Sequence, residues 1–472
     1  MRSSRFLFPT LLAGPVVLFL IMIPAMVRSQ SASLPGQDLS DGAGATITNA
    51  PTDFSSPLGN SSGICPSISG LSGMDAAELK NDISNCASNG LTSLTDFEAD
   101  KTKFEDQHNI LDGLGPVYNE KACVDCHNGP VSGGSAQVTE LRVGNLVSGT
   151  FKNPTVTIDY GQNTISGRSL INAQAICSDA EENSPDNQSQ RALRQSLTAL
   201  GDGFIESIAD STIIKNGQDV CTSSGGTICG EVVNVPVLEC TATSCPNGNL
   251  AVGRFGWKAQ HASLLSFSSD AYLNEMGITN RFNKTEVTGV CDAIPDPEDK
   301  ADASGLFDID HFARFMRATK APLPEDSEDI TASGTSGNIA NGQSVFINIG
   351  CNLCHTPQFV SAPAGTKVDA GAFIVPASLG SKIISPYSDF LLHNINTGDG
   401  IVQTSQQDTL NKIRSAPLWA VSSRSRFLHD GRAITLREAI LDHGGEAAGV
   451  ITNFKGQTSQ NQADLITFLK SL

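Results

Sequence analysis

Gly350-Cys351-Asn352-Leu353-Cys354-His355-Thr356-Pro357 is the stretch from which the rest of the sequence is best interpreted. Two cysteines, two intervening residues and a histidine form the signature of covalent haem attachment. The two thiols bind the vinyl groups on one edge of the haem, while the adjacent imidazole turns back onto the iron. One such motif could also be half of a zinc site or a coincidence.

A second copy of the motif lies upstream, at Cys123-Val124-Asp125-Cys126-His127. Two copies in one exported chain predict a protein with two covalently attached c-type haems. The attachment residues are then Cys123, Cys126, Cys351 and Cys354, and the proximal iron ligands are His127 and His355.

The composition limits the class of protein. A chain of 472 residues is long enough for two or three domains, and 39% hydrophobic and 17% charged residues are ordinary for a soluble protein. The formal net charge is −18, so nucleic acid is not expected as a partner. An acidic surface suits a small basic redox protein as electron donor or acceptor.

The N-terminus has the pattern of an export signal. Arg2 and Arg5 precede an apolar run from Phe6 to Val27, and Ser29 supplies the small residue of a cleavage site. This pattern predicts a signal peptide over residues 1–29 and a periplasmic protein. Because the apolar run is long, an uncleaved membrane anchor is the alternative.

The cysteines outside the two motifs fit an oxidising compartment. Of the 12 cysteines, eight remain after the haem motifs are assigned, and an even number favours disulfides. Eight cysteines allow 105 connectivities, so the pattern stays open. Local pairs are plausible at Cys65–Cys86, Cys221–Cys229 and Cys240–Cys245.

The expected fold is mainly α-helical, with two cytochrome c-like domains. Helices are predicted near residues 97–108, 263–272, 307–319, 341–349 and 461–472. The expected segments are a low-complexity N-terminal extension (30–96), a first haem domain (97–324), a Ser/Thr/Gly-rich acidic linker (325–337) and a second haem domain (338–472).

The first domain is expected to contain a long, partly β insertion, from Gly129 to about Val252. Val138–Val147 and Thr155–Ile158 are rich in β-branched and apolar residues, which predicts strands. A turn and a short helix are expected over 196–208. The segment from Cys221 to Cys245 is expected to be a loop braced by disulfides.

Other ionisable residues have less specific surroundings. His108 is expected to pack or be solvated rather than to bind iron, and Glu206 to be a carboxylate on a helix surface. His393 is expected to bond a haem propionate or to pack. His261 and His311 are expected at the surface or in the core.

From about Phe97 to Leu472 the chain resembles a family of dihaem c-type oxidoreductases, described as peroxidases or thiol oxidoreductases. They are distant relatives of bacterial dihaem cytochrome c peroxidases and of the methylamine-utilisation dihaem enzyme. The segments that carry the resemblance are GLGPVYNEKACVDCH, GFIESIAD, GRFGWKA, EMGIT, GCNLCHTP, PYSDFLLH, APLW and FLHDGRAITLREAILDHGGEA.

The resemblance implies a sixth ligand for the second haem. In the peroxidase relatives, a His-Asp/Ser-Gly segment precedes the distal ligand, usually Met, by a fixed spacing. Here His429-Asp430-Gly431 is followed at that spacing by His443, which implies that His443 lies opposite His355 on the iron. A His/His haem has a lower potential than the His/Met haem of those relatives.

The resemblance also implies that the first haem is the reaction site. Trp257 matches a tryptophan between the haems, and Glu275 matches an acid that would serve as general acid and base toward peroxide. The alternative is that Glu275 caps a turn and Trp257 only packs. Phe267 stands where the relatives carry glutamine. No histidine closely follows His127, although Met276 or His108 could close that site.

The sequence therefore predicts an exported dihaem oxidoreductase that reduces peroxide at the first haem with electrons relayed from the second. One alternative is an electron-transfer cytochrome with two six-coordinate haems. Another is an oxidase of thiols or other small reduced substrates. Calcium between the haems is left open as a further cofactor.

Overall fold

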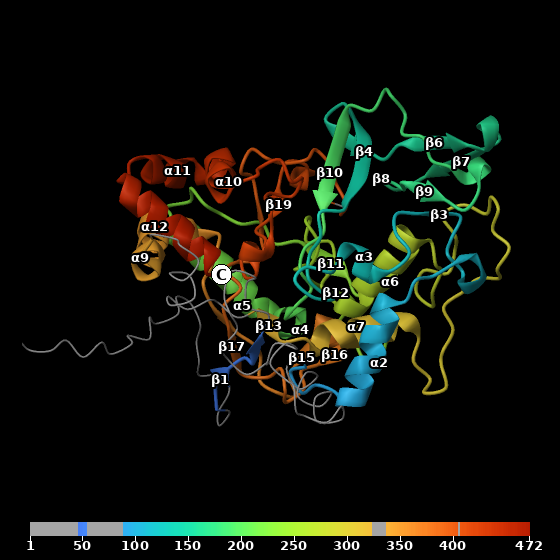
Figure 1. Cartoon of the computed structure of the whole chain (residues 1–472), viewed down its shortest axis with the longest axis horizontal. Coiled ribbons are helices and arrows are strands. Elements are labelled where there is room, and N and C mark those ends of the chain that lie inside the picture. The colour runs from blue at the N-terminus through green and yellow to red at the C-terminus, as the bar shows by residue number, and fades with distance from the viewer. Residues whose placement is uncertain (1–45, 54–87, 323–336, 405) are drawn as a thin grey trace, which may run out of the picture. The chain divides into compact units, whose positions relative to one another are not determined.

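The computed structural model describes residues 46–53, 88–322, 337–404 and 406–472 (Figure 1). It is 32% helix and 17% strand, so the expectation of a mainly α fold is confirmed only in part. Many of the loops contain short strands, whereas the sequence predicts strands only in the insertion. The expected signal peptide, the pair Cys65–Cys86 and nearly all of the expected linker lie outside the described residues. Within the described ranges, no helix combines the length and apolar character that crossing a membrane requires.

The region around the first motif is built on helices α2 (Leu94–Glu105), α6 (Leu264–Met276) and α7 (Asp308–Ala318). Figure 1 shows α2 beside α7, and the ring of Phe104 of α2 packs at a tilt against the ring of Phe315 of α7, with centroids 4.8 Å apart. The helix expected to reach His108 ends at Glu105, so His108 belongs to the following loop.

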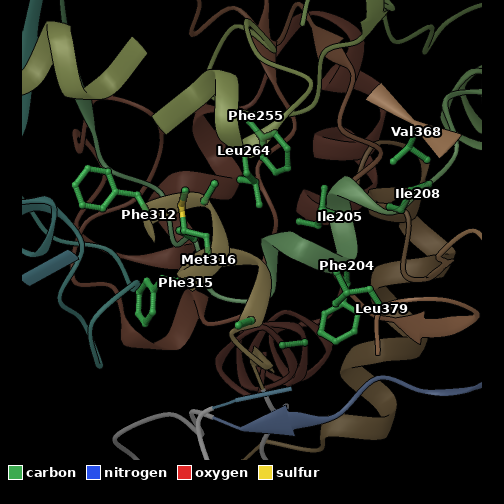
Figure 2. Packing of buried hydrophobic residues seen from close by; sticks show 14 of the residues in the cluster. Phe204, Ile205, Ile208, Phe255, Leu264, Phe312, Phe315, Met316, Val368 and Leu379 are labelled. Carbon is green, nitrogen blue, oxygen red and sulfur yellow. The ribbon is translucent and has the colours of Figure 1, made fainter. Parts of the chain in front are cut away.

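The largest hydrophobic cluster joins segments from both sides of the expected linker. Figure 2 shows Phe204 and Met316 in this cluster with Val368 and Leu379. Segments after the second motif therefore pack against helices that surround the first. Burying this apolar surface is the main favourable contribution to folding.

The insertion forms the expected strands. The sheet has the order β10-β4-β5, with β8 also paired to β4, and the antiparallel pair β6-β7 lies beside it in sequence. These strands are β4 (Thr139–Val147), β5 (Thr150–Lys152), β6 (Thr155–Ile158), β7 (Asn163–Ser166), β8 (Leu170–Ile171) and β10 (Gln190–Gln195).

Three disulfides brace the described residues, and two were expected. Cys221–Cys229 and Cys240–Cys245 are confirmed, while Cys177–Cys291 ties the insertion to the loop after α6. Cys221 lies in the last turn of a helix rather than in a loop. The elements of this region are α4 (Asp202–Glu206), α5 (Asp210–Ser223), β11 (Asn234–Pro236) and β12 (Leu250–Val252).

The region around the second motif is helical. Figure 1 shows α9 beside α12, and Phe346 of α9 packs edge-on against Phe468 of α12. Asn338 caps α9 by accepting a hydrogen bond from the backbone N–H of Asn341. These helices are α9 (Ile339–Ile349), α10 (Leu436–Asp442), α11 (Ala448–Lys455) and α12 (Ser459–Lys470).

Short strands connect distant segments, including part of the expected low-complexity extension. β1 pairs in parallel with β17, and β2 pairs in parallel with β13. The short elements are β1 (Thr48–Asn49), β2 (Thr52–Asp53), β3 (Val117–Tyr118), α3 (Cys123–Cys126), β9 (Gln174–Ala175), β13 (Ala321–Pro322), β14 (Phe359–Val360), β15 (Lys367–Val368), β16 (Phe373–Ile374), β17 (Lys382–Ile384), β18 (Leu392–His393) and β19 (Ile413–Arg414).

Candidate haem sites

The first motif forms one helical turn at the wall of a cavity. Cys123, Cys126 and His127 all line this cavity of about 210 Å³, called the first cavity below. His127 follows α3, and its Nδ1 lies 3.0 Å from the carbonyl oxygen of Gly134. A hydrogen bond donated from Nδ1 leaves Nε2 as the nitrogen that could bind a metal.

The second motif has the same local arrangement around a second cavity of about 180 Å³. Gly350 ends α9 with φ at 100°, a left-handed conformation that favours glycine, and the chain turns directly into Cys351. Cys354 and His355 also line this second cavity. His355 Nδ1 lies 2.9 Å from the carbonyl oxygen of Tyr387, so its Nε2 is again the free nitrogen.

His443 lies opposite His355 in the second cavity. It directly follows α10, and its Nδ1 is 2.6 Å from the carbonyl oxygen of Ala439. The ring centroids of His355 and His443 are 6.5 Å apart. Two metal–nitrogen bonds of about 2 Å plus the ring radii predict roughly 6 Å for imidazoles on one metal. The pair could therefore hold one iron between them.

The first cavity differs from the second in its histidines. His127 is the only histidine among the described residues that line it. His108 is buried outside the lining, with its Nε2 3.5 Å from the hydroxyl of Tyr272, which agrees with the expectation of a packed histidine. Met276 does line the first cavity, as His127 does.

Among the carboxyl groups that line the first cavity, Glu275 and Glu140 lie beside Arg142. Glu275, near the end of α6, accepts a hydrogen bond of 2.5 Å from the Asn119 side-chain amide. Glu140, on β4, pairs with Arg142, with Nε and Oε1 2.5 Å apart. The expected site residue Glu275 thus faces a second carboxylate that comes from the insertion.

The two carboxyl groups have opposite pKa shifts. Burial, followed by the negative charge of Glu140, raises the pKa of Glu275 to about 8. Burial also opposes ionisation of Glu140, but the adjacent Arg142 outweighs it and lowers the pKa of Glu140. At neutral pH the pair therefore holds one proton, mainly on Glu275.

Trp257 lines both cavities. Its indole Nε1 donates a 2.8 Å hydrogen bond to the carbonyl oxygen of Gln195. Its ring lies edge-on to the ring of His429, with centroids 6.1 Å apart, and His429 lines the second cavity. The structure thus brings Trp257 between the two sets of candidate ligands.

Comparison with known proteins identifies the family. Residues 173–472 match the family model described as "Di-haem oxidoreductase, putative peroxidase". The chain belongs to this di-haem oxidoreductase family. The match contains Trp257, Glu275 and the second motif, whereas the first motif precedes it. The structure places Cys123–His127 of this di-haem oxidoreductase in the same cavity as Trp257 and Glu275 of the matched part.

One solved structure is a distant match to the di-haem oxidoreductase. It is a MauG-like protein associated with microbial copper homeostasis, with 19% sequence identity and a TM-score of 0.28. The similarity covers 47% of this chain and 71% of the other. At that TM-score the likeness says nothing more about the sites. No curated protein sequence matches the chain.

Two arginines of the cavities were not expected from the sequence. Arg414 lines both cavities and Arg424 lines the second. Burial lowers the pKa of each guanidinium to about 10, so an anion in the cavity would stabilise it. The propionates of the haems in a di-haem oxidoreductase are such anions. Both arginines flank the APLW segment, but no spacing rule in the sequence assigns them.

His429 and Glu140 were also missed as cavity residues. His429 belongs to the segment used to find His443, yet no pattern shows that its own ring lines the second cavity. Glu140 belongs to an expected strand of the insertion, where a charged residue normally faces solvent. Only the folding of that strand over the first cavity brings Glu140 to Glu275.

Glu206 corrects a prediction. It was expected on a helix surface, but its exposed fraction is 0%. Arg317 Nε pairs with its carboxylate at 2.6 Å, and the backbone N–H of Leu264 donates to it at 2.7 Å. Helix α4 is a single short turn inside the core, so it has no solvent-facing side.

The remaining histidines have partners in the protein. His393 lines the second cavity and pairs with Asp389 at 2.8 Å and Glu446 at 3.0 Å. His261 pairs with Asp270 at 3.2 Å. His311 is buried in the core, with Nδ1 2.6 Å from Asp100.

Calcium was left open as a cofactor, and it needs several oxygen ligands. Among the described residues, one acidic group has carboxylate oxygens within 4.8 Å of one another: Glu286, Asp296 and Glu298. None of the three lines either cavity. This group therefore does not correspond to a calcium site between the haems.

Proposed function

We propose that this di-haem oxidoreductase is exported, carries two covalently attached c-type haems, and reduces peroxide at the first cavity with electrons that arrive through the second. The proposal rests on the difference between the cavities. The second has opposed imidazoles at His355 and His443, 6.5 Å apart. The first has one histidine, His127, beside Glu275.

The histidine arrangement divides the roles of the two sites. An iron with imidazole on both faces exchanges electrons without binding a substrate, which suits the second cavity as a relay. The first cavity offers one imidazole, from His127, and would leave room for a small substrate such as peroxide beside Glu275. Cys123 and Cys126 would fix the haem there, as Cys351 and Cys354 would in the second cavity.

Peroxide reduction consumes two electrons and two protons: H2O2 + 2e− + 2H+ gives two waters. The haem iron supplies the electron chemistry when it is bound. Glu275 supplies a place for the proton, because its raised pKa keeps a proton on the carboxyl at neutral pH. The carboxylic acid can donate this proton to the leaving oxygen as the O–O bond breaks, and the carboxylate is protonated again from solvent before the next turnover. Glu140 and Arg142 set that proton affinity.

Electrons would pass from the second cavity to the first by way of Trp257. This side chain is the natural route because it lines both cavities and lies against His429. The external donor would be a small redox protein. The net charge of −18 favours a basic partner through long-range attraction.

The test uses the reduced holoprotein, mixed with hydrogen peroxide while the Soret bands of both haems are followed by stopped flow. We expect the band of the first haem to respond first and Glu275→Gln to slow that response. Glu181→Gln, at an exposed position of the insertion, is the matched control. The proposal fails if neither band responds faster than the band of a simple bis-histidine cytochrome.

The second candidate function is electron transfer without catalysis. Met276 favours it, because this methionine lines the first cavity and could bind the iron opposite His127. The same experiment separates the two functions. Two low-spin haems that are both slow toward peroxide would establish the electron-transfer protein.

A further inference from the structure

Lys258 is a fully buried lysine that directly follows Trp257. Its ammonium group has four oxygen partners and no water-exposed surface. The partners are the carbonyl oxygens of Thr409 at 3.0 Å, Leu410 at 3.1 Å and Lys412 at 2.6 Å, and Asp399 Oδ1 at 3.1 Å.

This oxygen shell is of the kind that binds a hard cation. Calcium takes carboxylate and backbone carbonyl oxygens in proteins, usually six to eight of them. A lysine ammonium is a compact, strongly hydrated charge that also seeks oxygen. Here the carbonyl oxygens converge from one short segment, Thr409 to Lys412, and the ammonium of Lys258 stands at their common point.

The charge of Lys258 is balanced within the protein. Asp399 also binds Arg194, with Oδ2 2.6 Å from the guanidinium. Arg194 in turn lies 3.8 Å from Glu140 of the first cavity. Positive and negative groups therefore alternate from Lys258 to the first cavity. Asp399 thus has two cationic partners, and the three carbonyl oxygens together with Asp399 offset the cost of burying the charge of Lys258.

The segment from Thr409 to Arg414 also forms hydrogen bonds with the backbone on both sides of Trp257. The backbone N–H of Arg414 donates to the carbonyl oxygen of Trp257 at 2.9 Å. The Arg414 side chain donates to the carbonyl oxygen of Gly256 at 2.6 Å. Residues on both sides of Trp257 are thus held to the segment 409–414, which continues into the second cavity.

We propose that the ammonium of Lys258 takes, from within the chain, the place that a hard cation such as calcium would take among these four oxygens, and that Lys258 is a positioning residue for Trp257. The inference rests on the proposed relay through Trp257. The four oxygens already have their cation, so a calcium ion does not fit this place.

The first test uses the wild-type holoprotein. The midpoint potentials of both haems and their electron paramagnetic resonance spectra are measured with a calcium chelator, with added calcium chloride and with neither. We expect three identical results. A change in either potential or either spectrum on chelation would overturn the proposal, because it would show that the haems depend on a removable ion.

The second test removes the ammonium group. Lys258→Met keeps the approximate length of the side chain and loses one buried positive charge next to Trp257 in the chain. Ferric haem is the more positive state, so losing a nearby positive charge favours it, and both potentials should fall. The matched control is Lys215→Met, an exposed lysine of α5 paired with Asp219. Potentials equal to those of the control would overturn the assignment.

These measurements need no peroxide, so they separate the two proposals. A protein that does not react with peroxide but shows lowered potentials in Lys258→Met refutes the peroxidase function alone. A protein that reduces peroxide but whose potentials respond to the chelator refutes the role of Lys258 alone. If Lys258→Met does not fold, the chelator experiment on the wild-type protein still decides.

Discussion

Replacing Glu140 by glutamine should lower the pH above which the rate of the peroxide reaction declines. In the wild-type protein, burial and the charge of Glu140 raise the pKa of Glu275 to about 8. Two of the charged groups that act on Glu275 are Glu140 and Arg142, both on β4, and Arg168 acts on it as well. Glu140→Gln removes the negative charge, and it also leaves Arg142 without its carboxylate partner, so that Arg142 acts on Glu275 alone. Both changes lower the pKa of Glu275.

The size of the shift follows from the proximity of the two carboxyl groups. Two charges about 4 Å apart interact by about 4 kcal/mol at an effective dielectric constant of about 20. At about 1.36 kcal/mol per pKa unit this is roughly three units. We take about two units, because the amide that replaces the carboxylate stays buried and polar, which lowers the pKa of Glu275 to about 6. At about pH 7.5 the protonated fraction of Glu275 then falls from about three quarters to about 3%, a loss of roughly 25-fold.

The assay is the rate at which the first haem reacts with peroxide, measured by stopped flow between about pH 5 and 9. A carboxyl group is protonated below its pKa, so the wild-type rate should decline above about pH 8 and the Glu140→Gln rate above about pH 6. Glu275→Gln should show no such decline, and Glu181→Gln should follow the wild type. If the rate of Glu140→Gln declines at the same pH as the wild-type rate, or at a higher pH, the coupling between the two carboxyl groups is refuted.

Three further changes test other parts of the structure. His443→Ala should convert one of the two low-spin haems to high spin, and an unchanged electron paramagnetic resonance spectrum would refute its ligation. Trp257→Phe should slow reoxidation of the second haem by peroxide and leave the first, fast phase unchanged; equal slowing of both phases would contradict a relay. Arg317→Met leaves Glu206 charged and buried, so the free energy of unfolding in urea should fall by about 3–5 kcal/mol. Arg432→Met, which removes an exposed arginine, should lower the free energy of unfolding by only about 0–1 kcal/mol. Equal losses of unfolding free energy in Arg317→Met and Arg432→Met would contradict the buried ion pair between Arg317 and Glu206.

The features that the sequence predicts best are those set by residues close together in the chain. A haem motif is defined by five consecutive residues, and the strands Thr139–Val147 and Thr155–Ile158 by their own β-branched composition. The short disulfides join cysteines in one loop region, so their pairing is local as well. In each case the physical cause lies within a few residues, which is why the pattern is visible without the fold.

The features that the sequence does not predict depend on contacts between distant segments. Glu140 reaches Glu275 only because the insertion folds over the first cavity. Lys258 is an ordinary lysine in a Gly/Trp-rich segment until the carbonyl groups near Thr409 surround it. Glu206 was expected at a helix surface despite its apolar neighbours, because a lone carboxylate usually faces solvent, but the one-turn helix that carries it lies inside the core. The hydrophobic periodicity of the sequence does not indicate these contacts between distant segments.

The two cavities show how one local motif can serve two purposes. Each motif presents its histidine in the same way, with Nδ1 bonded to a backbone carbonyl oxygen and Nε2 free. What differs is the segment on the opposite side. The end of α10 brings His443 to the second cavity, whereas α6 and β4 bring Glu275 and Glu140 to the first. Under the proposed function, the motif would determine where a haem is held, and the residues that the fold brings to the opposite side would determine whether that haem passes electrons or meets a substrate.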